Sequence, residues 1–243
     1  MTTEHINLNN TYYENTDENF INALKFYETD YTHTQLTEML QNGNIPQKQI
    51  AALKLDTIKS ENDAQILLSN LTGQDGKIRE AVSMRLAEFM QDKNCISYFN
   101  PAKNAQKLLD AIIDINGNIC RNVISAISNL KNDKEFCEIF CKKLTDLTYN
   151  LLDIVEKFDF QDGKYKVNKE AFKLYWCLET IYVFWDKINF TDLKNIIRKA
   201  SQIEEYTIRE KAAKILTHDF NDGDLIAVKD KLKNDSNYYV RRF

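Results

Sequence analysis

The residues best placed to do chemistry are five cations that recur at one position of a repeated helical pattern. They are Lys48, Arg79, Arg121, Arg209 and Arg241. The planar guanidinium of arginine donates several hydrogen bonds at once, so one such side chain can hold a carboxylate and backbone carbonyls together. Two interpretations follow. The series is either a structural ladder that ties neighbouring repeats, or a cationic stripe, carried by Arg79, Arg121 and Arg209, that binds acidic peptide or phosphate.

A second group of candidate binding residues lies in the apolar segment 174–185, whose only charged residue is Glu179. On a helix, Tyr175, Trp176 and Tyr182 surround Glu179 at spacings of three and four residues. Aromatic residues are favoured interface anchors, and an acid among aromatic rings suits a lysine or arginine side chain. One interpretation is therefore an exposed aromatic patch that binds a partner. The other is a central helix buried between layers, with Glu179 in a salt bridge or at the rim.

The third candidate is the segment 236–243, which restarts the repeated pattern and stops after about two helical turns. A repeat stack usually closes with a polar capping surface. Here the segment carries Tyr238, Tyr239 and Phe243. These residues predict either a short terminal helix or an apolar end used for self-association or for a partner.

Motifs for catalysis, metals and cofactors are missing from the sequence. The three histidines, His5, His33 and His218, are scattered, and none belongs to a His-Glu pair. The five cysteines lack the spacing of a disulfide framework or a zinc site; they are Cys95, Cys120, Cys137, Cys141 and Cys177. No Gly-rich phosphate loop or Gly-x-Ser-x-Gly motif occurs. We therefore expect reduced, mostly buried thiols, no cofactor and no enzymatic activity.

Charge is unevenly distributed along the chain. The formal net charge is -4, and residues 1–44 hold seven acids against one base. An acidic end on a near-neutral body argues against a general nucleic-acid binder. No apolar run approaches the roughly 20 residues that span a bilayer, and the N-terminus lacks the pattern of a signal peptide. The sequence thus favours a cytoplasmic protein that contacts no membrane and binds another protein or a peptide.

Capping residues predict where the helices that carry these groups begin. The expected starts are Thr16 or Asp17, Pro46, Ser60, Asp75, Asn100-Pro101 and Asn116-Gly117. The helix from Pro46 is expected to reach about Lys59, and the helix from Asn100-Pro101 to reach about Ile115. An apolar stripe over 136–158 predicts a helix of about 25 residues, followed by a partner helix over 168–188.

The second helix of each pair repeats. Residues 48–58 match residues 79–89 without a gap, and the pattern returns at 121, 209 and 241. A period between 30 and 45 residues with one helix pair per period is the signature of an α-solenoid. The sequence therefore predicts an all-α fold made as a single domain over 1–243. Within it, 1–30 is an acidic N-terminal capping segment and 132–189 is a longer, atypical repeat.

The run Ile208–Leu216 follows the pattern Ile/Val-Arg-x-x-Ala-Ala-x-x-Leu, and the run Ile78–Leu86 shares its Ile-Arg start and its final leucine, with Val82 and Ser83 at the places of the two alanines. They resemble HEAT repeats, particularly the short type of phycobilisome-lyase-like proteins. The resemblance covers about residues 32–131 and 190–243 and implies a right-handed α-solenoid of about six HEAT-like helix pairs. HEAT stacks serve as scaffolds, adaptors, inhibitors and occasionally enzymes.

The predicted function is a non-enzymatic interaction module whose curved surface binds a protein or peptide. By resemblance alone, the alternative is an accessory or catalytic HEAT-like protein, either a chromophore lyase or a nucleic-acid-binding repair protein. Because the regular repeats establish the fold, the irregular middle is where a functional site is expected. There, residues 158–167 form either a small hairpin around Asp162-Gly163 or an irregular polar loop.

Overall fold

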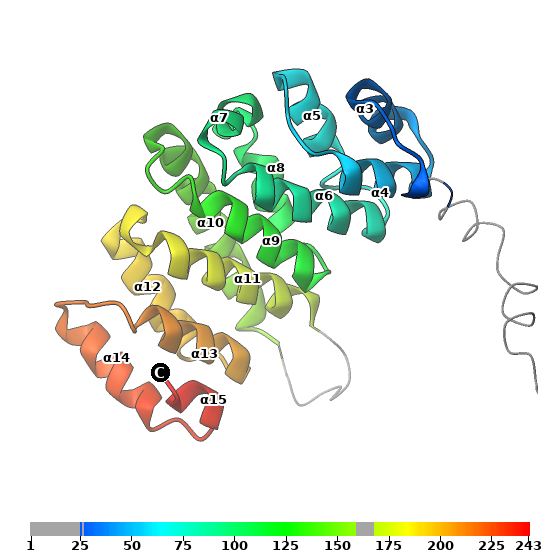
Figure 1. Ribbon diagram of the computed structural model, residues 1–243. Coiled ribbons are helices and arrows are strands. Elements are labelled where there is room, and N and C mark those ends of the chain that lie inside the picture. Colours follow the sequence, from blue (N-terminus) through cyan, green and yellow to red (C-terminus); the bar gives the residue numbers. More distant parts are fainter. Residues whose placement is uncertain (1–24, 26, 159–167) are drawn as a thin grey trace, which may run out of the picture.

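The computed structural model describes residue 25, residues 27–158 and residues 168–243 (Figure 1). All regular structure within these ranges is helical. The structure confirms the predicted all-helical solenoid. Two predictions lie outside the described residues: the hairpin at Asp162-Gly163, and most of the acidic segment 1–30 with its helix from Thr16 or Asp17.

The described helices form six pairs. The first helices are α3 His33–Asn42, α5 Glu61–Ser69, α8 Ala105–Ile112, α10 Lys134–Val155, α12 Phe190–Ala200 and α14 Gly223–Lys233. The second helices are α4 Ile45–Lys54, α6 Gly76–Phe89, α9 Gly117–Ser128, α11 Lys169–Phe184, α13 Tyr206–Ile215 and α15 Tyr238–Arg241. Three short elements lie between them: α7 Lys93–Ile96, η1 Ser97–Phe99 and η2 Trp185–Lys187.

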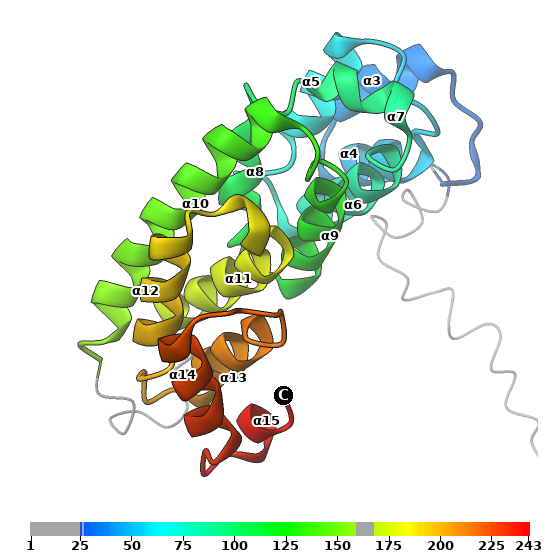
Figure 2. The same ribbon diagram turned by 90° about the vertical axis from the view of Figure 1, so that its left-hand side faces the viewer.

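The pairs stack into a curved array of two rows. The second helices line the inner side of the curve and the first helices its outer side (Figure 1). A view turned by 90° shows α10, α12 and α14 side by side in one row and α9, α11, α13 and α15 in the other (Figure 2). Consecutive second helices pack directly on one another, although α9 and α11 touch along less of their length than their neighbours do.

Local capping chemistry sets the helix boundaries. Ser60 and Asp75 accept hydrogen bonds from the first turns of α5 and α6, as the sequence predicts. Asn44 and Gln47 cap α4 reciprocally, with Pro46 in its first turn. Asn116 caps α9 by accepting from the Asn118 amide at 2.9 Å.

One apolar core joins the two rows from Leu36 to Val240. Three of its largest members gather between α10 and α11, where Phe136, Phe140 and Phe184 are fully buried. The rings of Phe136 and Phe140 stack with centroids 4.9 Å apart, and Phe184 lies 5.6 Å from Phe140. At 22 residues, α10 is about 33 Å long. This helix fulfils the expectation raised by the apolar stripe.

The predicted helix start at Asn100-Pro101 is wrong. Asn100 ends η1 in the left-handed conformation, with φ of 43°, and α8 begins only at Ala105. Asparagine tolerates this conformation better than most residues, so the cap signal here marks a chain reversal. The reversal lets Phe99 enter the core at 1% exposure while Asn104 donates to the Phe99 carbonyl at 2.8 Å.

The helix from Pro46 is also shorter than predicted. It ends at Lys54, and residues 55–59 are not helical. Leu55 and Ile58 are buried in this non-helical stretch, and the Leu55 carbonyl accepts from the Arg85 guanidinium. The tertiary contact therefore replaces the last turn of the helix. None of the helices that the structure describes is both long and apolar enough to cross a membrane.

Candidate binding face

The inner face of the stack is formed by the side chains that α4, α6, α9, α11, α13 and α15 expose. These helices carry twelve cations and five acids, whereas the outer row of first helices carries ten cations and eleven acids. The inner cations are Lys48, Lys54, Lys77, Arg79, Arg85, Arg121, Lys169, Lys173, Arg209, Lys211, Lys214 and Arg241. Cationic residues are therefore concentrated on the second helices, a surplus that the net charge of the whole chain conceals.

Two of the repeated cations tie one repeat to the next. The Arg79 guanidinium on α6 donates to both oxygens of Asp114, at 2.7 and 3.1 Å. Arg209 on α13 holds Asp235 with the same two distances. Each also donates to a backbone carbonyl, Arg79 to Gln74 and Arg209 to Ile203 at 2.9 Å. We call this bidentate pair, between an arginine and the aspartate three residues before the next second helix, the clasp.

The clasp also orders the start of the following helix. Asp114 accepts from the Asn116 amide and Asp235 from the Asn237 amide, each at 2.8 Å. Both asparagines then cap their own helices. The hydrogen bond that Arg209 donates lowers the pKa of Asp235, and the hydrogen bond that Arg79 donates to Asp114 raises the pKa of Arg79. At the α6–α9 and α13–α15 steps, the contacts match the interpretation that the repeated cations form a structural ladder between neighbouring repeats.

The remaining repeated cations have no carboxylate partner among the described residues. Lys48 donates to the Asn70 side chain at 3.0 Å, and Arg241 donates to the carbonyls of Asp235 and Ser236. Arg121 is exposed and bonds only within the first turn of its own helix, to the Gly117 carbonyl at 3.2 Å and to Asn118 Oδ1 at 2.8 Å. Whether Arg79, Arg121 and Arg209 bind a partner stays a prediction.

Glu179 lies at the α11–α13 step, where it is held by two lysines that the sequence prediction missed. Lys211 and Lys214 each donate to it at 2.6 Å, one to each carboxylate oxygen. Burial opposes ionisation of Glu179, but the two lysine hydrogen bonds outweigh it and lower the pKa of the carboxyl. Burial likewise opposes the charge on Lys211, yet its bond to Glu179 raises the pKa of the ammonium.

Tyrosines complete this cluster. The Lys211 ammonium lies 4.1 Å from the Tyr175 ring centroid, and the Lys214 ammonium lies 4.4 Å from that of Tyr182. Both distances suit cation–π attraction. These contacts match the interpretation in which Glu179 of a packed helix lies in a salt bridge, and binding of a partner by Tyr175, Glu179 and Tyr182 stays a prediction. The sequence does hold a signal for this contact: Lys211 and Lys214 lie one helical turn apart on α13, the second helix of the pair after α11.

Aromatic stacking continues from this cluster towards the ends of α11 and α13. The His218 ring lies between Tyr182 and Trp185, with centroids 4.7 and 4.6 Å away. Its Nε2 is 3.0 Å from the Tyr182 carbonyl. His218, which belongs to no recognisable motif in the sequence, is therefore packed between two aromatic rings.

Trp176 departs from the exposed patch that the sequence suggested. It is 7% exposed, with Phe172 and Tyr175 against its ring at 6.1 and 5.2 Å. Its Nε1 is buried and has no hydrogen-bond acceptor. The other three residues of the predicted patch, Tyr175, Glu179 and Tyr182, are partly exposed. An all-round apolar helix packed between neighbours accounts for the burial of Trp176.

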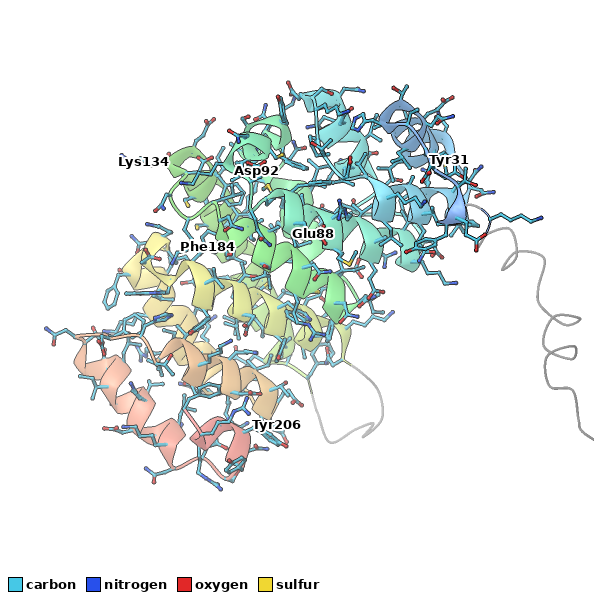
Figure 3. The ribbon with its side chains drawn as sticks, in the orientation of Figure 1. Tyr31, Glu88, Asp92, Lys134, Phe184 and Tyr206 are labelled. Atoms are coloured by element: carbon cyan, nitrogen blue, oxygen red, sulfur yellow. The ribbon has the colours of Figure 1, made fainter. Side chains whose placement is uncertain are left out.

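The C-terminal aromatics are partly exposed. Tyr238 is 65% and Tyr239 50% accessible, and the Tyr206 ring lies 6.2 Å from that of Tyr239. Tyr206 begins α13 and lies towards the opposite end of the stack from Tyr31 (Figure 3). Phe243 is half-buried beneath the Arg242 guanidinium at 5.0 Å. Self-association through these residues stays a prediction.

Sequence comparison finds no matching protein family and no matching curated protein. Comparison with solved structures finds an engineered protein at 14% identity and a TM-score of 0.46, covering 88% of this chain and 93% of that one. A designed armadillo repeat protein matches at 14% and 0.44, over 87% and 96% of the two chains. A computationally designed armadillo repeat protein for modular peptide recognition matches at 14% and 0.48, over 87% and 96%. These scores are too low to assign a family or a function.

Proposed function

We propose that this protein is a non-enzymatic interaction module that binds another protein or a peptide on its inner face. The observation that carries the proposal is the concentration of cations on the second helices, against near balance on the first helices. An extended curved surface with one sign of charge excess steers and holds a macromolecule of opposite charge. The expected partner therefore presents an acidic segment.

The remaining parts of the proposal rest on the sequence. The repeats are of HEAT type, as the runs Ile78–Leu86 and Ile208–Leu216 indicate, and the chain acts as one domain in the cytoplasm. The continuous core from Leu36 to Val240 supports a single unit. Five free cysteines, all buried, suit a reducing compartment. The chromophore-lyase and nucleic-acid alternatives stay predictions from resemblance.

The proposal is tested by selecting peptides from a displayed random library on the full chain and on two double variants. Lys77→Glu with Lys169→Glu reverses charge on the inner face, and both lysines are exposed in the first turns of α6 and α11. Lys134→Glu with Lys142→Glu makes the same charge change on the outer helix α10, where both are exposed. An acid in a first helical turn favours the helix, so folding should be retained.

We expect acidic peptides that bind the wild type and the outer variant and lose at least tenfold in affinity for the inner variant. Circular dichroism and the urea midpoint verify that each variant is folded. Peptides that lose affinity only for the outer variant would place the binding surface on the first helices. Selection of no acidic sequence would contradict the charge argument.

A further inference from the structure

Part of the positive charge on the inner face has no carboxylate partner among the described residues. Lys77, Arg121 and Lys169 are exposed on three consecutive second helices, α6, α9 and α11, and none of them forms an ion pair there. The five acids of the second helices are already engaged, four in ion pairs and one by side-chain amides: Glu88, Glu170, Glu179 and Glu210, and then Glu80. The acids of the inner layer therefore cannot balance these three cations.

The opposite charge is found in residues 1–24 of the same chain. This segment has four acids and neither lysine nor arginine; the acids are Glu4, Glu14, Asp17 and Glu18. It also contains Tyr12, Tyr13 and Phe20, whose rings can accept a cation on their faces. The segment thus offers carboxylates and aromatic rings, the two kinds of group that attract the ammonium and guanidinium groups of the inner face.

The first described residues join this segment to the inner layer. Lys54, the last residue of α4, donates to the Thr29 carbonyl at 2.8 Å. Its ammonium lies 5.4 Å from the Tyr27 ring centroid and 5.8 Å from that of Tyr31. Helix α4 begins the inner row and packs directly on α6 (Figure 1). Residues 1–24 are therefore attached where the inner face starts, beside a lysine that already contacts the chain through a carbonyl and two aromatic rings.

The segment is long enough to follow the inner face. Twenty-four residues span at most about 80 Å when fully extended. The three steps from α4 to α11 cover about 30 Å, because packed helices lie about 8 to 10 Å apart. Attachment to the stack also gives the segment an effective concentration of about a millimolar at this surface, so that weak charge contacts suffice to hold it.

We propose that residues 1–24 dock on the inner face of their own chain, with their acids against Lys77, Arg121 and Lys169. There the segment occupies the surface on which the proposed function places an acidic partner. The competition with a partner rests on the proposed function, whereas the docking rests on the charge of the segment, its attachment at Lys54 and its reach. The chain thus carries its own competitor, which a partner must displace before it binds.

Carbodiimide crosslinking of the full chain tests the docking, because this reagent joins a carboxylate directly to a lysine amine that it contacts. An equal mixture of nitrogen-14 and nitrogen-15 chains is crosslinked, and the joined peptides are identified by mass spectrometry. We expect the acids of residues 1–24 to be joined to Lys77 and Lys169 within chains of one isotope. Lys134 and Lys142, both exposed on the outer helix α10, are the controls and should not be joined to the segment.

The affinity for a fluorescein-labelled octaglutamate peptide tests the competition. The neutral-segment variant replaces the four acids of residues 1–24 by amides: Glu4→Gln, Glu14→Gln, Asp17→Asn and Glu18→Gln. The outer-acid variant makes the same change of net charge at four exposed acids of α8, α10 and α14: Asp110→Asn, Glu138→Gln, Asp146→Asn and Asp230→Asn. We expect the neutral-segment variant to bind the peptide about fivefold or more tighter than the wild type, as for removal of a tethered competitor, and the outer-acid variant to bind it much as the wild type does.

Absence of crosslinks to Lys77 and Lys169, or equal crosslinking to Lys134 and Lys142, would overturn the docking. Crosslinks between chains of different isotope would place the segment on a second copy and overturn the arrangement within one chain. Equal octaglutamate affinity in the wild type and the neutral-segment variant would overturn the competition. If octaglutamate binds neither protein while the crosslinks to Lys77 and Lys169 form, the acidic partner of the proposed function is contradicted and the docking stands.

Discussion

Glu179 of α11 accepts a hydrogen bond from Lys211 of α13 at 2.6 Å, although the lysine is only 6% exposed. A buried ammonium is tolerated because this carboxylate and the Tyr175 ring compensate for lost hydration. The contact spans two consecutive second helices. It therefore stabilises the α11–α13 step, at which no clasp is present among the described residues.

Replacing Glu179 by glutamine should destabilise the protein by about 3 kcal/mol, because it leaves Lys211 and Lys214 near one another without a counter-charge. The free energy of unfolding in urea measures the loss. The control is Glu210→Gln, which removes the partner of the exposed Arg242 and should cost about 1 kcal/mol or less. Equal losses in the two variants would contradict a special role for Glu179.

The Glu179 contribution should depend on pH in the acid range. Its folded-state pKa lies below the ordinary value of 4.5, so its stabilisation is present above the unfolded pKa and is lost as pH falls through the folded pKa. The difference in unfolding free energy between wild type and Glu179→Gln should be constant near neutrality and shrink below pH 4.5. The raised pKa of Lys211 predicts a second loss as pH rises beyond 10.5. A difference that stays constant down to acid unfolding would be the contrary result.

Arg79→Gln and Arg121→Gln should differ in stability although the two arginines occupy the same place in the repeat. Arg79→Gln breaks a clasp and leaves Asp114 partly buried without its cation, which should cost about 2 to 3 kcal/mol. Arg121 has no carboxylate partner in the described part of the chain, so its replacement should change stability by about 0.5 kcal/mol or less. Thermal and urea unfolding of both variants check this. A large loss in Arg121→Gln would mean that it holds the stack together.

The cysteines should react slowly with thiol reagents in the folded protein. Burial raises the pKa of the Cys120, Cys141 and Cys177 thiols to about 12. The thiolate fraction of these cysteines near neutral pH is therefore well below that of an ordinary thiol. In a colorimetric thiol assay with an aromatic disulfide reagent, we expect all five cysteines to react only after denaturation. Fast labelling of these three in the native state would contradict their burial.

The sequence predicts the fold where local chemistry decides it. Ser60, Asp75 and Asn116 cap helices because their side chains accept from amides two or three residues away. The apolar stripe through Phe136 and Phe140 likewise reports the face that α10 buries. Prediction fails where a distant contact overrides the local signal. Asn100 carries a helix-start pattern, but burial of Phe99 requires a chain reversal there.

The candidate site was predictable only in part. The repeat identifies Arg79, Arg121 and Arg209 as equivalent, but their partners are set by the connection before a later helix, 35 residues on for Arg79 and 26 for Arg209. Spacing around Glu179 suggested a cation among aromatic rings, but the donors lie 32 and 35 residues away on α13. Burial of Trp176 depends on packing against Gly117, which no single helix reveals.

The uneven spacing of clasps along the inner layer has a mechanical consequence. In a solenoid each repeat is held by its neighbours alone, so stiffness is a property of each step. The clasp between Arg79 and Asp114 joins α6 to the start of α9. In contrast, α9 and α11 touch along less of their length and have no clasp among the described residues. We therefore expect the α9–α11 step to bend more easily than the α6–α9 step. Bending there would let the curvature of the stack adjust to the shape of what it carries.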